Sequence, residues 1–166
     1  MYERASVVVD AIAPDFTLKD EDGRNIPLND FRKGKKLILA FIRGVDDSKT
    51  RKLLDYLKDD CERFKYHGAE VLAISYGSVD FNKTLHRTLR LPFHILSDPD
   101  CRTIKLYGLY NQYDKLIGPA IFVLNQAGTV MFMYLGKNPE DMVENEEIIR
   151  VLEGDTQARP EWPRQG

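Results

Sequence analysis

The sequence predicts an α/β domain in which a central mixed sheet carries helices on both faces. Residues 37–41 and 71–74 are apolar without alternation, which predicts strands at 36–41 and 70–75 that are covered on both sides. Residues 48–67 and 79–89 repeat apolar side chains at spacings of three and four, which indicates amphipathic helices. Strands and helices that alternate in this way favour parallel pairing of the first strands of the sheet.

The N-terminal part of the chain predicts a small β-hairpin that extends this sheet. Residues 6–9 are β-branched and apolar and are expected to be a strand or an extended lead-in. Residues 15–28 hold two short apolar stretches around an acidic turn, in which Gly23 supplies the left-handed conformation. Pro27 cannot donate a ladder hydrogen bond, so this hairpin is expected at the edge of the sheet.

The C-terminal half predicts a short strand at 93–96, a helix at 102–107, a hairpin of strands at 120–124 and 129–135, and a last helix at 140–152. The expected order is therefore β-α-β-α-β-α-β-β-α. We expect one domain over residues 1–153 and a C-terminal tail over residues 154–166.

Bulk composition excludes several classes of function. The chain has 166 residues, 43% hydrophobic and 30% charged, with a net charge of −2. A near-neutral charge predicts neither nucleic acid nor an anionic membrane as a partner. No apolar run approaches the roughly 20 residues that span a bilayer, and nothing resembles a signal peptide. We therefore expect a cytoplasmic protein.

Metal-ligating residue types are sparse in the sequence. Cys61 and Cys101 are too few for a disulfide scaffold and are not spaced like a zinc knuckle. His67, His86 and His94 are scattered, with no paired spacing. The sequence therefore predicts no metal site, and we expect no cofactor.

The junction between the strand at 36–41 and the helix at 48–67 is the candidate site. The amino end of a helix offers free N–H groups and a positive dipole end. One interpretation is that Asp46, Asp47 and Ser48 cap the helix. The other is that Arg43, Ser48 and Thr50 bind a small anion, which the two aspartates would weaken. The junction contains no cysteine and no histidine.

Motifs along most of the chain resemble the peroxiredoxin-like redoxin superfamily of the alkyl hydroperoxide reductase and thiol-specific antioxidant type. They are Ala-Pro-Asp-Phe-Thr-Leu at 13–18, Gly-Ala-Glu-Val-Leu-Ala-Ile-Ser at 68–75, Leu-Ser-Asp-Pro-Asp at 96–100, Gly-Pro-Ala-Ile-Phe-Val-Leu at 118–124 and Leu-Gly-Lys-Asn-Pro at 135–139. The resemblance implies a thioredoxin-like fold, in agreement with the element order.

The same resemblance shows that the junction between residues 41 and 51 lacks the cysteines of its relatives. Relatives of this subgroup read Phe-Tyr-Arg-Gly, two residues, then Cys-x-x-Cys-Arg. This chain keeps Arg43 and Arg51 in register but has Asp47 and Thr50 where the cysteines would stand. Against the general pattern Pro-x-x-x-Thr-x-x-Cys, Thr50 replaces the peroxide-reacting cysteine. The resemblance also implies a cis peptide bond at Pro119, opposite the active loop.

Neither remaining cysteine is an obvious substitute for the missing thiol. Cys61 lies eleven residues after Thr50, roughly 16 Å along a continuous helix, and is expected to be a buried core thiol. Cys101 is expected in the first turn of the helix at 102–107, where the dipole lowers a thiol pKa. Asp98 and Asp100 act in the opposite direction.

These observations leave three hypotheses. The first is a peroxiredoxin-like protein that is inactive as a thiol peroxidase and binds an unidentified protein or small-molecule partner. The second is a divergent antioxidant thiol peroxidase or disulfide oxidoreductase that uses Cys101. The third is a subunit held by its tail through Trp162, which lies between two prolines. A homodimer is compatible with the resemblance, because relatives often self-associate.

Overall fold

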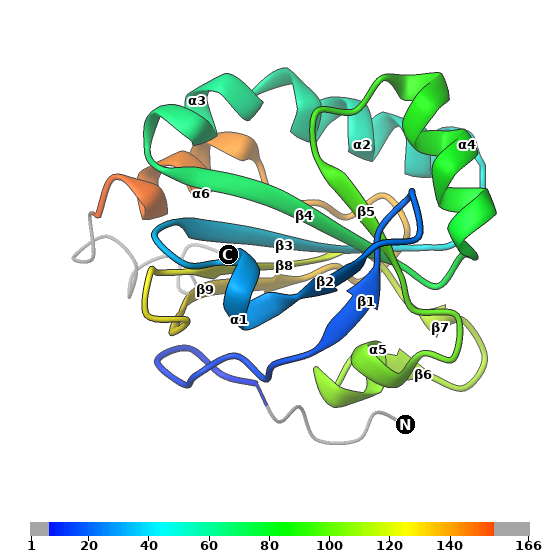
Figure 1. Ribbon diagram of the computed structural model, residues 1–166, viewed down its shortest axis with the longest axis horizontal. Helices are drawn as coiled ribbons and strands as arrows, with labels where there is room; N and C mark the ends of the chain where they lie inside the picture. The colour runs from blue at the N-terminus through cyan, green and yellow to red at the C-terminus, as the bar shows by residue number, and fades with distance from the viewer. Residues whose placement is uncertain (1–6, 155–166) are drawn as a thin grey trace.

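The structure is a computed structural model that describes residues 7–154, and these fold around one seven-stranded mixed sheet (Figure 1). Its strands, in order across the sheet, are β2 (Asn25–Pro27), β1 (Thr17–Lys19), β5 (His94–Ser97), β4 (Ala69–Ser75), β3 (Lys36–Ile42), β8 (Ala120–Leu124) and β9 (Val130–Leu135). Strands β3, β4 and β5 are parallel, whereas β8 and β9 form an antiparallel hairpin. The predicted change from parallel to antiparallel pairing is confirmed.

Helices cover both faces of this sheet (Figure 1). They are α1 (Leu28–Phe31), α2 (Ser48–Asp59), α3 (Cys61–Tyr66), α4 (Val79–Leu89), α5 (Arg102–Leu106) and α6 (Asn145–Leu152). Helices α2, α3, α4 and α6 pack into the core on one face, and α1 and α5 pack into the core on the other.

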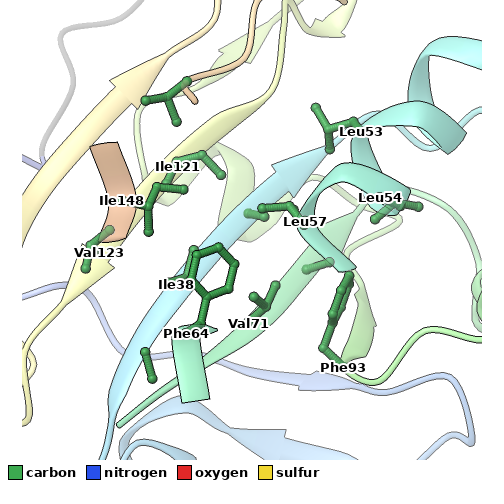
Figure 2. Close-up of a cluster of buried hydrophobic side chains, with 14 of the residues drawn as sticks. Ile38, Leu53, Leu54, Leu57, Phe64, Val71, Phe93, Ile121, Val123 and Ile148 are labelled. Atoms are coloured by element: carbon green, nitrogen blue, oxygen red, sulfur yellow. The ribbon is translucent and has the colours of Figure 1, made fainter. Parts of the chain in front are cut away.

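Strand β3 separates the two cores because its successive side chains point to opposite faces. Ile38 and Ala40 belong to one cluster, and Leu39 and Phe41 belong to the other. Figure 2 shows the first cluster, in which leucines of α2 and Phe64 of α3 lie over β3 and β4. The apolar run in β3 does not alternate with polar residues because every residue of this strand after Lys36 is buried.

The predicted N-terminal hairpin is confirmed. β1 and β2 pair antiparallel, with Leu18 opposite Ile26, and Gly23 has a φ of 83° in the turn between them. β2 is an edge strand, which accommodates Pro27. β1 also pairs with β5, so the hairpin extends the main sheet. Residues 6–9 were expected to be a strand or an extended lead-in; residues 7–9 form no strand, and residue 6 lies outside the described part.

Two sequence-based helix boundaries are wrong, and one small sheet is missing from the predicted elements. The helix expected at 48–67 is two helices, because Asp60 leaves the helical conformation (φ −112°, ψ 15°) and its carboxylate accepts a hydrogen bond from Asn145 at 2.9 Å. The last helix begins at Asn145 rather than residue 140. A two-stranded sheet of β6 (Tyr110–Asn111) and β7 (Lys115–Leu116) was not predicted.

Most of the expected tail, including Trp162, lies outside the described residues. Within the described part, no helix is both long and apolar enough to cross a membrane.

Candidate functional site

The candidate site lies where β3, β4 and β5 end, at one edge of the parallel part of the sheet. The segment 43–47 follows β3, and residues 76–78 follow β4. Hydrogen bonds tie these ends together: Ser97 Oγ donates to the Gly77 carbonyl at 2.5 Å, and the Gly77 amide donates to Ser75 Oγ at 3.0 Å. This edge, at the carboxyl ends of strands and the amino ends of helices, is where α/β proteins place their ligands.

Asp47 caps α2, as one of the two interpretations of this junction predicted. Its backbone is extended, and its Oδ1 accepts a hydrogen bond from the Thr50 amide at 2.9 Å. Its Oδ2 forms an ion pair with Arg43 at 2.8 Å. The hydrogen bond from the Thr50 amide lowers the pKa of Asp47 most, and the Thr50 side chain and then the positive charge of Arg43 lower it further. The carboxylate therefore already engages two groups that could hold an external anion.

Thr50 lies beneath this cap and is 5% exposed, whereas Ser48 is exposed on the first turn of α2. Asp46 and Arg51 form a second pair through two hydrogen bonds of 2.6 and 3.0 Å. The hydrogen bond from Arg51 lowers the pKa of Asp46. The charges of this loop are thus paired within the loop and helix, which leaves its surface close to neutral.

The loop approaches the β4–α4 connection closely. A Cβ atom on Gly44 would lie 2.5 Å from the Gly77 amide nitrogen and 2.6 Å from the Tyr76 ring. No ordinary side chain fits at that separation, so glycine is required at position 44 by packing. Gly44 thereby fixes the path of the chain between Arg43 and Asp47.

Pro119 reaches the same edge from β8. Phe41 pairs with Ala120 across the antiparallel β3–β8 ladder, so Pro119 lies beside the end of β3. Pro119 is buried, and its carbonyl accepts a hydrogen bond from the Gly136 amide at 2.8 Å. The expectation of a cis bond here is wrong, because none of the peptide bonds among residues 7–154 is cis.

Cys101 is not placed as the sequence predicted. It precedes α5 instead of lying in its first turn, it adopts a left-handed conformation (φ 59°), and it is 3% exposed. Burial, followed by the charge of Asp98, raises the pKa of the Cys101 thiol, although a lowered value was expected. Its core cluster lies on the opposite face of the sheet from the leucines of α2.

Cys61 is only half-buried, because the chain bends at Asp60 just before it. Its Sγ lies 3.5 Å from the Leu57 carbonyl, and burial raises its pKa to about 11. The thiol packs against the core on the α2 side, as expected, but it is only partly buried. Both cysteines are free thiols.

A groove beside the capped end of α2 was not predicted. It is lined by Lys49, Lys52, Leu53, Tyr56, Pro139, Glu140 and Met142. Lys49 and Lys52 are exposed, and neither forms an ion pair with another residue in the part of the chain that the structure describes. The sequence showed the lysines, but no local pattern places residues 139–142 against α2.

Comparisons with known proteins identify relatives of this chain. The AhpC/TSA family matches residues 9–133. Peroxiredoxin Q of Gentiana triflora, named chloroplastic, is 34% identical over 151 residues, which cover 90% of this chain and 68% of the relative. Alkyl hydroperoxide reductase E of Mycobacterium bovis is 29% identical over 126 residues, 75% of this chain and 82% of that protein. The chain spans 57% to 80% of the length of the plant peroxiredoxins that it matches.

Solved structures share the fold. Peroxidoxin BcpB from Mycobacterium tuberculosis superposes with a TM-score of 0.81 at 18% identity, over 90% of this chain and 98% of that one. A protein assigned as thiol:disulfide interchange protein DsbE, from Chlorobium tepidum, gives a TM-score of 0.71 at 21% identity, over 89% and 99%. The fold is thioredoxin-like, as the sequence predicted.

Proposed function

Because the chain belongs to the AhpC/TSA family, we propose that it keeps the peroxiredoxin scaffold without thiol peroxidase activity and acts by binding a partner protein or a small ligand. One observation carries this proposal. The junction of β3 and α2 contains Thr50 under an Asp47 cap, and the chain has no cysteine before Cys61.

The chemistry of the junction supports the loss of activity. Reduction of a peroxide needs a thiolate that attacks the O–O bond and is itself oxidised to a sulfenic acid. A threonine hydroxyl is not ionised near neutral pH and has no such oxidation state. Asp47 also engages the Thr50 amide and Arg43, two groups that would stabilise a thiolate at this position. In this proposal Arg43, Asp47, Ser48, Thr50 and Pro119 border the binding surface instead of forming a catalytic site, with Thr50 and Pro119 buried.

The alternative is an enzyme that uses Cys101, and family membership alone favours it. The raised pKa and burial of Cys101 reduce both its thiolate fraction and its access to peroxide. Asp98, which raises the pKa of Cys101, accepts hydrogen bonds from the amides of Thr103 and Ile104, so its position is fixed. These features make Cys101 a structural thiol in our proposal.

The groove next to the loop is the surface that we propose for the ligand. Leu53, Tyr56, Pro139 and Met142 give it an apolar lining. The ammonium groups of Lys49 and Lys52, which form no ion pair among residues 7–154, outnumber the one carboxylate of the lining, that of Glu140. This combination suits a ligand with an apolar part and a negative charge. A carboxylate with a short alkyl chain and an acidic segment of a partner protein share that chemistry.

A peroxidase assay tests the first half of the proposal. The reduced protein is mixed with hydrogen peroxide or an alkyl hydroperoxide, and thioredoxin, glutaredoxin or dithiothreitol is supplied as the reductant. We expect no turnover above the buffer rate for the native sequence, Cys61→Ser or Cys101→Ser. Turnover that disappears in Cys101→Ser alone would establish the alternative enzyme instead.

A titration with octanoate, followed by two-dimensional amide NMR, tests the second half. We expect shifts that are confined to the groove, centred on Lys52, Tyr56 and Met142. Lys49→Glu/Lys52→Glu should weaken binding, whereas Lys83→Glu/Arg87→Glu, at two exposed positions of α4, serves as a charge-matched control. Shifts that scatter over the surface, or that both variants leave unchanged, would contradict the groove as the binding site.

Location and assembly are part of the proposal. The plant relatives are named chloroplastic, whereas for this chain we propose the cytoplasm, supported by two cysteines that are free thiols. Fluorescence microscopy of a tagged chain tests this location.

We also propose a homodimer, and light scattering coupled to gel filtration tests it through the molecular mass in solution.

A further inference from the structure

A cluster of side chains of metal-binding types lies away from the β3–α2 junction, at the turn of the N-terminal hairpin. Asp20 and Glu21 begin the turn between β1 and β2, which reaches toward α4 and β5 (Figure 1). His94 is the first residue of β5, and His86 lies in the last turn of α4. One ligand atom from each of Asp20, Glu21 and His94 lies within 4.8 Å of the other two.

Each carboxylate in the cluster is held by the backbone through one oxygen. Asp20 Oδ1 accepts hydrogen bonds from the amides of Asp22 and Arg24, both at 2.9 Å. Glu21 Oε1 accepts one from the Ile95 amide at 3.1 Å. These bonds orient the carboxylates in the way that outer-shell hydrogen bonds orient metal ligands. The second oxygen of each group is left facing the histidines.

The distances between these facing atoms match those in a zinc site. Glu21 Oε2 lies 3.0 Å from His94 Nδ1 and 3.7 Å from His86 Nε2, and Asp20 Oδ2 lies 3.7 Å from His94 Nδ1. Ligands bound tetrahedrally to zinc at about 2.1 Å lie about 3.4 Å from one another. The observed values fall on both sides of that separation.

The charges in the cluster favour a bound cation. Asp20 is 1% exposed and Glu21 is 5% exposed, and two carboxyl groups so deeply buried need polar or charged partners. Within residues 7–154, neither forms an ion pair with a lysine or an arginine, and both face histidines. Nothing in that range donates a hydrogen bond to Asp20 Oδ2, because His94 Nδ1 at 3.7 Å is too distant.

We propose that Asp20, Glu21 and His94 bind a divalent transition-metal ion of the zinc type. His86 lies 3.7 Å from Glu21 Oε2, outside the group of three mutually close ligands, and flanks the site. Imidazole and carboxylate together suit such an ion better than calcium or magnesium, which prefer oxygen ligands alone. The ion clamps the hairpin at the edge of the sheet to β5. The site is independent of the function proposed for the junction.

Spacing along the chain could not reveal this site, and the sequence accordingly predicted no metal. Glu21 and His94 are 73 residues apart and meet only because β1 pairs with β5. His86 joins them because the chain reverses between α4 and β5, after Arg90 adopts a left-handed conformation (φ 53°).

Calorimetric titration of the chelator-treated protein with zinc tests the proposal. We expect one zinc ion per chain, loss of affinity by at least about 100-fold in Glu21→Gln and His94→Gln, and a smaller loss in His86→Gln. His67→Gln, which removes a histidine outside the cluster, should bind like the native sequence. Zinc should also raise the melting temperature of the native protein, whereas magnesium should not.

Substitution with cobalt distinguishes this site from a thiol site. We expect visible d–d absorption without the near-ultraviolet thiolate band that Cys61 would produce as a ligand. No uptake of zinc by the native protein would overturn the proposal and leave the histidines as simple ion-pair partners. Equal binding by His67→Gln, Glu21→Gln and His94→Gln would overturn it as well, provided that circular dichroism shows all three to be folded.

Discussion

Replacement of Asp47 by alanine tests the account of the capped junction. The variant loses the N-cap hydrogen bond to the Thr50 amide, worth about 1 kcal/mol. It also removes the partner of Arg43, whose side chain is 19% exposed, and a pair of this kind contributes about 0.5 kcal/mol. The free energy of unfolding should therefore fall by about 1.5 kcal/mol. For a domain of this size that lowers the melting temperature by about 3 to 6 °C.

The pH dependence of this loss follows from the pKa of Asp47. The fold lowers that pKa, so the contribution of the carboxylate is complete above its unfolded value of about 3.9. It is lost as the pH falls through the lower pKa of the folded state. The difference in stability between the native protein and Asp47→Ala should therefore be constant near pH 7 and should shrink below about pH 4.

Urea denaturation, followed by circular dichroism, measures both effects. Asp46→Ala is the matched control, because Asp46 is the neighbouring aspartate and pairs with Arg51 on the surface, without capping the helix. Equal destabilisation by Asp46→Ala and Asp47→Ala, or an effect of Asp47→Ala that does not depend on pH, would contradict the role of Asp47 as the helix cap.

Three further perturbations probe the core, the loop and the thiols. Leu57→Ala removes a fully buried side chain and should lower the free energy of unfolding by about 2 to 5 kcal/mol in urea denaturation, whereas Tyr113→Ala, at an 80% exposed position, should change it little. Gly44→Ala introduces a Cβ atom 2.5 Å from the Gly77 amide nitrogen and should cost about 1 to 3 kcal/mol; an unchanged melting temperature would contradict the close packing. Alkylation followed by mass spectrometry should label Cys61 before Cys101, with a rate at Cys61 that rises about tenfold per pH unit below its pKa of about 11.

Much of the fold could be predicted from the sequence, because its signals are local. Apolar runs without alternation identified β3 and β4, apolar side chains at spacings of three and four identified α4, and Gly23 marked the hairpin turn. The errors arose where a distant contact decides local structure. The break at Asp60 depends on a hydrogen bond from Asn145, 85 residues away, and periodicity in the region around it reads as one helix.

The candidate site, too, could be predicted only where local sequence determines its structure. The Asp47 cap was readable from residue type and position, and the fold brings Pro119 to the same edge through the β3–β8 ladder. The environment of Cys101 was not readable, because its exposure and left-handed backbone follow from packing around α5. The sequence also did not predict the groove at α2 or the cluster at the hairpin turn, since each joins elements that are far apart in sequence.

The most direct test of the central claim is the intact mass of the reduced protein after one equivalent of hydrogen peroxide. Asp47→Thr/Thr50→Cys restores the family's threonine and cysteine at these two positions and serves as the positive control. We predict that this variant gains one oxygen atom or the adducts that a sulfenic acid forms, while the native chain keeps its mass over the same time. Rapid oxidation of the native chain at Cys101 would contradict the claim that this scaffold has lost its thiol chemistry.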